Sequence, residues 1–393
     1  MTDALNPARG QVAIVGVGTA GCGEAPGYSD IELLALAAQA AVADAGLSLR
    51  DIDGLATANL NAAMWPLNVA EYLGLRPRFV EGTNVGGAAF VTQMQMAAHA
   101  LLAGECNAVL VCYGSAQKTA TMARRERLAA RSLLDPFPFE APYEPFIPPS
   151  GYALMASRHM HQYGTTRRQL AEVAVAARRW AQLNPEAYAR EPLSIEDVLA
   201  SRMVSTPLSA LDCCLVTDGG GAFVMTRADR VRDLPQPPVH LLSCATAVWH
   251  RQISSMTDLT VTPARESGAR AFAAAGLTPR DVDVVQLYDA FTINTLLFLE
   301  DLGFCPKGEG GRFVEDGAIA PGGTLPVNTN GGGLSCVHPN MYGTFEVIEA
   351  VRQLRGQAGD RQVAGAQVAL VHGNGGVAAA SQATALLGTA EVL

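Results

Sequence analysis

The sequence predicts an α/β protein that is built from two duplicated halves. The first observation is an internal repeat: three segments of the first half recur in the second half in the same order, with an offset that grows along the chain as loop insertions would produce. The second observation is that helical patterns alternate with short apolar runs, which predicts sheets covered by helices on both faces. The matched segments are residues 43–53 and 273–283, 83–87 and 329–333, and 108–112 and 368–372.

The first elements of the chain follow this alternation. An apolar run that starts at Gln11 ends in glycines, which predicts a buried strand followed by a tight turn. The next segment has the apolar spacing of a helix, in which Ser29 or Asp30 can cap the start and Gly46 can end the last turn.

Residues from about 115 to 205 have no counterpart in the second half. This stretch begins with a basic run, continues through a proline-rich segment at 135–149, and then shows a long helical pattern over residues 167–182. We interpret it as an insertion on top of the first half, in a position where substrate sites are often found. The basic run consists of Arg124, Arg125, Arg127 and Arg131.

Composition excludes several classes of function. The formal net charge of −9 disfavours nucleic-acid binding, because that requires a basic face to neutralise phosphates. No apolar run approaches about 18–20 residues, so no membrane-spanning helix is expected. The eight cysteines form no CxxC pair, which gives a metal site little support. With no export signal in the sequence, we expect reduced thiols and a cytoplasmic protein.

Three glycine-rich turns between strands and helices are candidates for ligand contacts. They lie at residues 84–88, 331–338 and 372–376. Glycine lets the backbone approach a ligand, and free amides at a helix start favour anionic groups. None of the turns has the spacing of a dinucleotide or triphosphate loop, so those ligands are disfavoured. Each turn alone is also compatible with a purely structural role.

His338 lies in the richest of these stretches. Pro339 suits the first turn of a helix, which would place His338 near the helix cap. The positive end of a helix disfavours imidazolium, and a neutral imidazole is what a general base requires. A capping or packed histidine explains the same pattern, and His372 at the end of the last strand has the same two interpretations.

A second cluster follows the predicted strand at residues 284–287. It delivers Tyr288 and Asp289 into a loop, where they could exchange protons with a substrate. The alternative is that Asp289 caps a helix and Tyr288 lies at the edge of the core. Cys213 and Cys214 precede another apolar strand, and we expect both in the core.

These motifs resemble the thiolase superfamily, and more closely its branch of sterol-carrier-protein-type thiolases and lipid-transfer proteins. The resemblance spans nearly the whole chain and is densest between about 280 and 380. It implies a thiolase fold, in which two βαβαβαββ halves form a five-layer α/β/α/β/α core, with an inserted loop domain and usually a dimer. The halves would then cover residues 1–235 and 236–393. The segments that carry the resemblance are Tyr288-Asp-Ala-Phe-Thr, Leu302-Gly-Phe-Cys, Leu325-Pro-Val-Asn-Thr, His338-Pro339, Glu349-Ala-Val-Arg-Gln-Leu-Arg and Gly373-Asn-Gly-Gly.

The chain departs from the thiolases at the nucleophile. Gly86 stands where a thiolase has its reactive cysteine, and Val371 stands where the second family cysteine is expected, whereas the family histidine is present as His338. Without a thiolate no acyl-enzyme can form by the usual route. Cys336, two residues before His338, is a candidate for a displaced nucleophile.

The remaining apparatus suits retro-aldol cleavage of a β-hydroxyacyl-CoA, which needs no covalent intermediate. Cysteine-free members of this branch include aldolases that shorten sterol side chains. They resemble this chain in having a tyrosine at the position of Tyr288, but they often have a second tyrosine where this chain has His338. Two alternatives remain: an acyltransferase that uses Cys336 or a partner's thiol, and a non-catalytic scaffold subunit.

The resemblance assigns a role to each candidate residue. We expect His338 and Tyr288 to transfer protons and Asp289 to orient them. Coenzyme A enters as part of the substrate, with no covalently bound cofactor and no metal. A homodimer and a small partner protein with an OB fold and a zinc ribbon are implied. The expected substrate-binding residues are Gly86, Gly87, Tyr342, Asn374 and Gly375, with the glycine loops supplying amides to the thioester oxygen.

Overall fold

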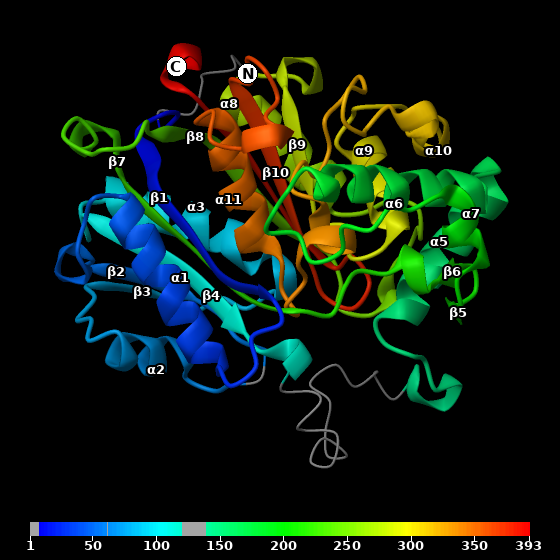
Figure 1. Ribbon diagram of the computed structural model, residues 1–393, viewed down its shortest axis with the longest axis horizontal. Coiled ribbons are helices and arrows are strands. Elements are labelled where there is room, and N and C mark those ends of the chain that lie inside the picture. Colours follow the sequence, from blue (N-terminus) through cyan, green and yellow to red (C-terminus); the bar gives the residue numbers. More distant parts are fainter. Residues whose placement is uncertain (1–7, 61, 120–138) are drawn as a thin grey trace.

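The computed structural model describes residues 8–60, 62–119 and 139–393. Its nine main strands form one mixed sheet (Figure 1). The first half contains β1 (Val12–Gly23), α1 (Asp30–Asp44), β2 (Gly54–Thr57), α2 (Trp65–Tyr72), β3 (Phe79–Glu81), α3 (Ala89–Leu102), β4 (Ala108–Ser115) and β7 (Asp218–Arg227). The second half contains β8 (Val239–Val248), α8 (Ala264–Ala275), β9 (Val284–Leu287), α9 (Thr292–Asp301), α10 (Gly310–Phe313), α11 (Gly343–Leu354), β10 (Val368–Gly375) and β11 (Ser381–Gly388).

The strand order shows the duplication directly. The sheet runs β3-β2-β4-β7-β1-β8-β11-β10-β9, so the two halves meet where β1 pairs with β8 in antiparallel fashion. In the first half β2 is parallel to β4, and β4 is antiparallel to β7. In the second half β9 is parallel to β10, and β10 is antiparallel to β11, so the same pattern of pairing recurs. A parallel bridge between Val285 and Val327 occupies the place that β3 has in the first half.

The helices complete five layers, as the resemblance to the thiolase superfamily implies. Helix α1 packs on β1, β4 and β7, and α8 packs on β8 and β11, which makes these two helices the outer layers. Helices α3 and α11 contact each other and strands of both halves, so they form the central layer (Figure 1). The strands of the two halves are nevertheless one continuous sheet, because the β1–β8 pairing joins them at Ala13 and His240.

Local sequence explains where helix α1 begins and where α1 and α8 end. Ser29 is the N-cap of α1, and its backbone N–H donates to the Glu32 carboxylate at 2.8 Å, which completes a capping box. Gly46 follows the helix with a φ of 69°, a left-handed conformation that glycine adopts without strain. In the second half Gly276 ends α8 in the same way, with a φ of 66°.

An aspartate in each repeat ties the helix-to-strand turn to a neighbouring strand. The Asp53 carboxylate accepts hydrogen bonds from the backbone N–H groups of Asn107 and Ala108 at 2.7 and 2.9 Å. Asp283 accepts from the N–H groups of Gln367 and Val368 at 2.8 and 2.9 Å. Both aspartates therefore bind the amides that lead into the adjacent parallel strand, β4 or β10.

The insertion between β4 and β7 contains α5 (Pro149–Tyr163), α6 (Arg167–Gln182), α7 (Ile195–Ala200) and the short hairpin of β5 (Met203–Ser205) and β6 (Leu208–Ser209). The predicted long helix is confirmed as α6. The predicted basic run lies outside the described residues.

Our interpretation that the insertion lies on top of the first half is wrong in one respect. Helices α5 and α6 pack against α9 of the second half (Figure 1). Hydrogen bonds stabilise this packing. The Trp180 indole donates to the carbonyl of Ile319 at 2.9 Å, and the Asn184 amide donates to the carbonyl of Asn330 at 2.9 Å. The insertion thus links the two halves.

None of the helices in the described ranges has the length and apolar content needed to cross a membrane.

The duplicated aspartates lead to a stability prediction. Asp53→Ala and Asp283→Ala should each lower the free energy of unfolding by about 1.5–3 kcal/mol, because two backbone amides lose a charged acceptor. Thermal and urea unfolding of the variants would measure the loss. Asp229→Ala, which removes an exposed carboxylate paired only with Arg227 in the described hydrogen bonds, is the control and should change stability by less than about 0.5 kcal/mol. Equal effects in all three variants would contradict the prediction.

Candidate active site

A cavity of about 460 Å³ lies where the glycine loops of the two halves meet. The loop before α3, the end of β9, the segment before α11 and the turn between β10 and β11 all contribute to it, together with α5 of the insertion. Both polar and apolar residues line it, as in pockets that bind small molecules. The predicted site residues in this wall are Gly86, Gly87, Tyr288, His338, Asn374 and Gly375.

Gly86 leaves no space for a nucleophilic side chain. Its φ is +77°, and a Cβ placed on it would lie 2.7 Å from the backbone N of Gly376 and 2.9 Å from the Cα of Gly375. Both neighbours are backbone atoms, so a cysteine at this position would force the two glycine loops apart. The backbone N–H of Gly86 donates to the Asn84 side chain at 3.3 Å, which occupies one of the amides expected to face the thioester oxygen.

Tyr288 fills the space beside the second glycine of this loop. A side chain at Gly87 would overlap the phenol ring of Tyr288, so only glycine fits there. The Tyr288 hydroxyl accepts a hydrogen bond from the backbone N–H of Tyr342 at 3.1 Å. Burial is the main cause that raises the pKa of Tyr288 well above its ordinary value, and the charge of neighbouring groups adds to it. The phenol therefore keeps its proton at neutral pH.

His338 presents a neutral imidazole beside this phenol. The two rings are 5.5 Å apart and meet edge to face at 88°. Nε2 of His338 is buried and has no hydrogen-bond partner among the described residues. The backbone of His338 is held by Thr217, whose hydroxyl accepts from the His338 N–H at 2.9 Å.

Burial lowers the pKa of His338 to about 4. The neutral imidazole agrees with our prediction, but its predicted cause is wrong. Helix α11 begins at Gly343, so neither His338 nor Pro339 belongs to its first turn. Desolvation of the ring, not the positive end of a helix, keeps it uncharged.

Asp289 lies behind the wall of the cavity and not in it. Its carboxylate accepts from the backbone N–H groups of Gly333 and Leu334 at 2.6 and 3.3 Å. These amides belong to a single π-helical turn, Gly332–Cys336, which leads directly to His338. Burial raises the pKa of Asp289 to about 7 despite these bonds. The arrangement gives Asp289 a route for orienting His338 through the backbone.

Tyr342 and Asn374 differ from their expected roles. Tyr342 is fully buried and does not line the cavity, and its hydroxyl donates to the Asn330 side chain at 2.9 Å. Asn374 does line the cavity, but its amide donates to the Tyr152 hydroxyl at 2.9 Å and accepts from Gln382 at 2.8 Å. Both side chains support the wall through these internal bonds.

Cys336 and His372 are placed away from the cavity. Cys336 is buried beside Asn184, whose amide donates to its sulfur at 3.5 Å, and it lines a separate narrow cavity. Burial raises the pKa of its thiol well above the ordinary value, which is opposite to what a nucleophilic thiolate requires. His372 is buried with both ring nitrogens bonded, to Thr384 and Gln382. Val371 is also fully buried in β10.

Sequence reasoning missed several residues of the wall. Cys214, which we expected in the core, lines the cavity near Tyr288, and burial raises the pKa of its thiol. Tyr152, His250 and Arg251 also line it. They come from the insertion and from the segment after β8, where no repeat or spacing marks them, so the sequence carried no signal for their role.

Glu346 was also missed, and it is the most unusual group near the site. Its side chain is fully buried in the first turns of α11, and neither carboxylate oxygen has a hydrogen-bond partner among the described residues. Burial raises its pKa well above the ordinary value, and the charge of Asp289 adds to the shift. Glu346 in turn raises the pKa of Tyr288 and of Tyr342, so it lies within electrostatic range of both. A buried carboxyl without a partner is expected to be protonated.

The imidazole of His338 should stay neutral well below the ordinary histidine pKa. Its pKa of about 4 means that between pH 5 and 6.5 the ring carries no charge, whereas an exposed histidine titrates there. NMR spectra of protein labelled with ¹⁵N in histidine would measure this, with the resonance assigned by its loss in His338→Gln. An inflection for His338 near pH 6.5 would contradict the structure.

Glu346 should make stability decrease with rising pH. A group whose pKa is raised in the folded state binds its proton more tightly there, so its contribution is complete below its ordinary pKa of 4.5 and is lost as pH rises towards the folded-state value. Relative to Glu346→Gln, the wild type should lose up to about 1.4 kcal/mol per pH unit above pH 5. Urea unfolding of both proteins at pH 5 to 8 tests this, and a pH-independent difference would rule it out.

Comparison with known proteins places this geometry in a family. Residues 245–389 match the family described as Thiolase C-terminal domain-like. The chain is 38% identical to the 17-hydroxy-3-oxo-4-pregnene-20-carboxyl-CoA lyase of Mycobacterium tuberculosis, over 94% of this chain and 97% of the lyase. It is 34% identical to the steroid side-chain-cleaving aldolase of Thermomonospora curvata, over 88% and 91%. It is also 35% identical to the acetyl-CoA acetyltransferase of Methanothermobacter thermautotrophicus, over 94% and 98%.

Solved structures agree with these relatives. The Ltp2-ChsH2(DUF35) aldolase superposes with a TM-score of 0.86 at 32% identity, and the alignment covers 97% of this chain and 98% of that one. A monomeric SCP2-thiolase-like protein of Mycobacterium smegmatis, 23% identical with a TM-score of 0.74, shares the fold over 98% of this chain and 78% of its own. The chain therefore belongs to the thiolase superfamily, in the branch of the sterol-carrier-protein-type thiolases and lipid-transfer proteins.

Proposed function

We propose that this protein is an acyl-CoA carbon–carbon lyase that cleaves a β-hydroxyacyl-CoA by a retro-aldol reaction. The observation that carries the proposal is the wall of the cavity: the backbone around Gly86 excludes a nucleophile, while the buried Nε2 of His338 and the phenol of Tyr288 remain side by side. Relatives named as a carboxyl-CoA lyase and a side-chain-cleaving aldolase support the same reaction class.

The two proton-transfer groups suit the two proton transfers of the reaction, removal of the β-hydroxyl proton and protonation of the α carbon. Neutral His338 accepts the proton of the β-hydroxyl, and the bond between the α and β carbons breaks to leave a carbonyl product and the enolate of the shortened thioester. Tyr288, which holds its proton because of burial, then protonates the α carbon. Return of the proton from His338 to Tyr288 restores the site, so no net proton is consumed.

The other site residues act through these two. Asp289 is a positioning residue, because it binds the turn that precedes His338. Coenzyme A arrives as part of the substrate, and the cavity edge formed by His250 and Arg251 offers polar contacts for the thioester end. Gly87 and Gly375 bring the backbone close to the reacting carbonyl.

A partner protein is part of the proposal. The solved Ltp2-ChsH2(DUF35) aldolase is named as an assembly of two proteins, and this chain matches one of its chains over almost its whole length. We infer that this lyase works with a small protein that has an OB fold and a zinc ribbon and presents the acyl-CoA. A homodimer is the oligomeric state that the family resemblance supports.

An acyltransferase is the second candidate, because one relative is named as an acetyl-CoA acetyltransferase. For this candidate Cys214 suits the role of the reacting thiol better than Cys336, because Cys214 lines the cavity and Cys336 lines a separate one. The raised pKa of Cys214 opposes this role, since a thiol is a weaker nucleophile than a thiolate. A non-catalytic scaffold subunit is the third candidate.

The decisive assay uses the purified chain with its partner and a set of β-hydroxyacyl-CoAs. Release of an aldehyde or ketone together with the shortened acyl-CoA supports the lyase. His338→Ala and Tyr288→Phe should each lower kcat by about 100-fold or more, the usual contribution of a proton-transfer group. The control is Cys336→Ser, outside the cavity, which should retain the rate.

Two other outcomes would reject the lyase, and a third would reject only its proposed proton-transfer residues. Acyl transfer that is blocked by iodoacetamide and lost in Cys214→Ala would identify an acyltransferase. A tight partner complex without any turnover would identify a scaffold. Carbonyl release that persists unchanged in both His338→Ala and Tyr288→Phe would show that neither residue transfers the protons.

A further inference from the structure

Asn340 lies in the wall of the active-site cavity, two residues after His338, and is partly exposed. Three asparagines line this cavity, and the side-chain amides of the other two are engaged within the protein. The Asn84 amide donates to a backbone carbonyl at 3.1 Å, and the Asn374 amide donates to the Tyr152 hydroxyl at 2.9 Å. The side chain of Asn340 has no hydrogen-bond partner among the residues that the structure describes. Its N–H groups are therefore free for a ligand in the cavity.

The backbone of Asn340 has a φ of 74°, in the left-handed region. Glycine adopts this conformation without strain, and asparagine is one of the few other residues that are found there. A glycine would therefore satisfy the turn, so the geometry of the turn alone does not explain the side chain. Residues held in such conformations cluster at active sites and ligand sites.

Hydrogen bonds fix the chain on both sides of Asn340. The hydroxyl of Tyr113 donates to the carbonyl of Pro339, and the backbone N–H of Tyr342 donates to the Tyr288 hydroxyl at 3.1 Å. The amide of Asn340 is therefore attached to a backbone that is tied to Tyr288, the proposed proton donor. A donor that is fixed in place before the reaction needs little reorganisation, which is the condition for electrostatic stabilisation of a transition state.

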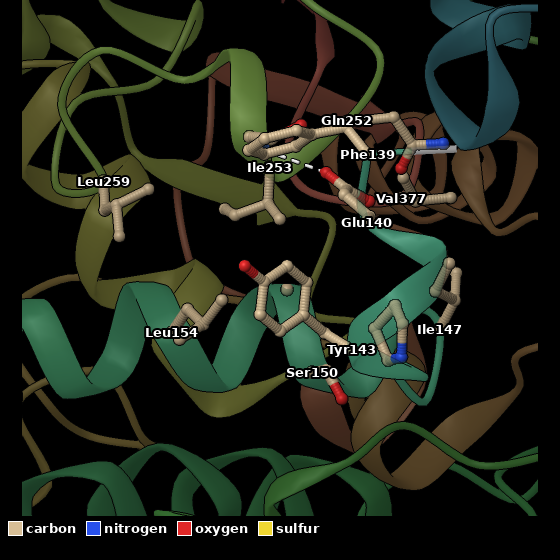
Figure 2. A pocket seen from close by; sticks show the side chains of 13 residues that line it. Phe139, Glu140, Tyr143, Ile147, Ser150, Leu154, Gln252, Ile253, Leu259 and Val377 are labelled. Atoms are coloured by element: carbon tan, nitrogen blue, oxygen red, sulfur yellow. Dashed lines mark hydrogen bonds between the residues drawn. The ribbon is translucent and has the colours of Figure 1, made fainter. Parts of the chain in front are cut away.

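A second, apolar cavity shows the opposite arrangement of polar groups (Figure 2). Its Glu140 carboxylate accepts from the backbone N–H of Ser254 at 2.9 Å, and its Ser150 hydroxyl accepts from the N–H of Phe146 at 3.0 Å. These two polar side chains are engaged in bonds within the protein. Asn340 is not part of that wall, so it offers its amide to the active-site cavity.

The proposed reaction needs a hydrogen-bond donor in addition to its acid and its base. When the bond between the α and β carbons breaks, the electron pair passes to the thioester oxygen and an enolate forms. Charge on this oxygen is costly in a buried cavity unless a donor faces it. His338 and Tyr288 are occupied with the two proton transfers, so a third group suits the oxygen. A carboxamide fits this role, because it donates an N–H without giving up its proton.

We propose that Asn340 is a catalytic residue whose side-chain amide donates a hydrogen bond to the thioester oxygen of the substrate and thereby stabilises the enolate. The inference rests on the proposed lyase function, since the cleavage places negative charge on that oxygen. It adds a side-chain donor to the backbone around Gly87 and Gly375 in the proposed site.

Kinetics of the full chain with its partner test this role during turnover. Asn340→Gly keeps the left-handed backbone and removes the amide. It should lower kcat about 100-fold while KM changes by less than about 5-fold, because the hydrogen bond is strongest to the enolate. Asn340→Asp keeps the size of the side chain but offers no N–H, so it should lower kcat at least as much. The matched control is Asp316→Gly, at an exposed position with a φ of 57° that lines neither cavity, and it should retain the rate.

Infrared spectroscopy tests the contact without turnover. Butyryl-CoA has no β-hydroxyl and is not cleaved, and a ¹³C label at its carbonyl separates the carbonyl stretch from the protein bands. Binding to the wild type should move this stretch to lower frequency, because a hydrogen bond weakens the C=O bond. The shift should be smaller in Asn340→Gly and unchanged in Asp316→Gly. Thermal unfolding would verify that the variants are folded, and Asn340→Asp gives the same comparison if Asn340→Gly does not fold.

The two measurements separate this inference from the lyase. Cleavage that Asn340→Gly leaves unchanged would overturn the role of Asn340 and leave the lyase standing. Cleavage that is lost in Asn340→Gly but retained in Asn340→Asp would also overturn it, because the side chain would then act as an acceptor. An infrared shift that is equal in the wild type and in Asn340→Gly would exclude the bond to the carbonyl. A shift that is lost in Asn340→Gly, without cleavage of any β-hydroxyacyl-CoA, would support the thioester contact and overturn the lyase.

Discussion

The close contact between the two glycine loops is the constraint on which the site depends. Gly86 of the first half lies against Gly375 and Gly376 of the second half, at a separation that excludes a Cβ. The contact joins the halves at the floor of the cavity, and the Ser381 hydroxyl strengthens it by donating to the carbonyl of Val85 at 2.6 Å. This contact therefore joins the halves at the cavity and leaves no space for a side chain at residue 86.

Burial sets the protonation states of the ionisable side chains in and behind the cavity wall. The same low-polarity surroundings lower the pKa of His338 and raise the pKa values of Tyr288, Asp289 and Glu346. Each shift favours the uncharged form, so the site at neutral pH holds a neutral base beside a neutral acid. Such a pair can accept a proton from a substrate hydroxyl and donate a proton to a carbanion, the two proton transfers that a retro-aldol reaction requires.

The insertion positions this chemistry although it contributes few of its atoms. Residues after α6 bind the π-helical turn through backbone bonds from Tyr188 to Cys336 and from Ala189 to Ser335. The Arg178 guanidinium donates to the Ser335 hydroxyl at 3.0 Å, and Asp289 holds the same turn from the other side. The turn that leads to His338 is thus held by hydrogen bonds to the insertion and to Asp289, which follows β9. The insertion also contributes Tyr152 to the wall of the cavity that contains His338.

The sequence by itself determined the duplicated architecture, the caps of α1 and the helix α6. These depend on spacing along the chain, on glycine at left-handed positions and on repeated motifs, all of which are local. Only the tertiary structure decided that Cys336 faces another cavity, that Asp289 and Tyr342 lie behind the wall, and that the insertion packs on the second half. It also decided that the rings of Tyr288 and His338 meet, that Cys214 lines the same cavity, and that Glu346 lies within electrostatic range of Tyr288. The physical reason is that these outcomes depend on which way a side chain turns from its backbone and on what desolvates it, and both are set by neighbours that are distant in the sequence.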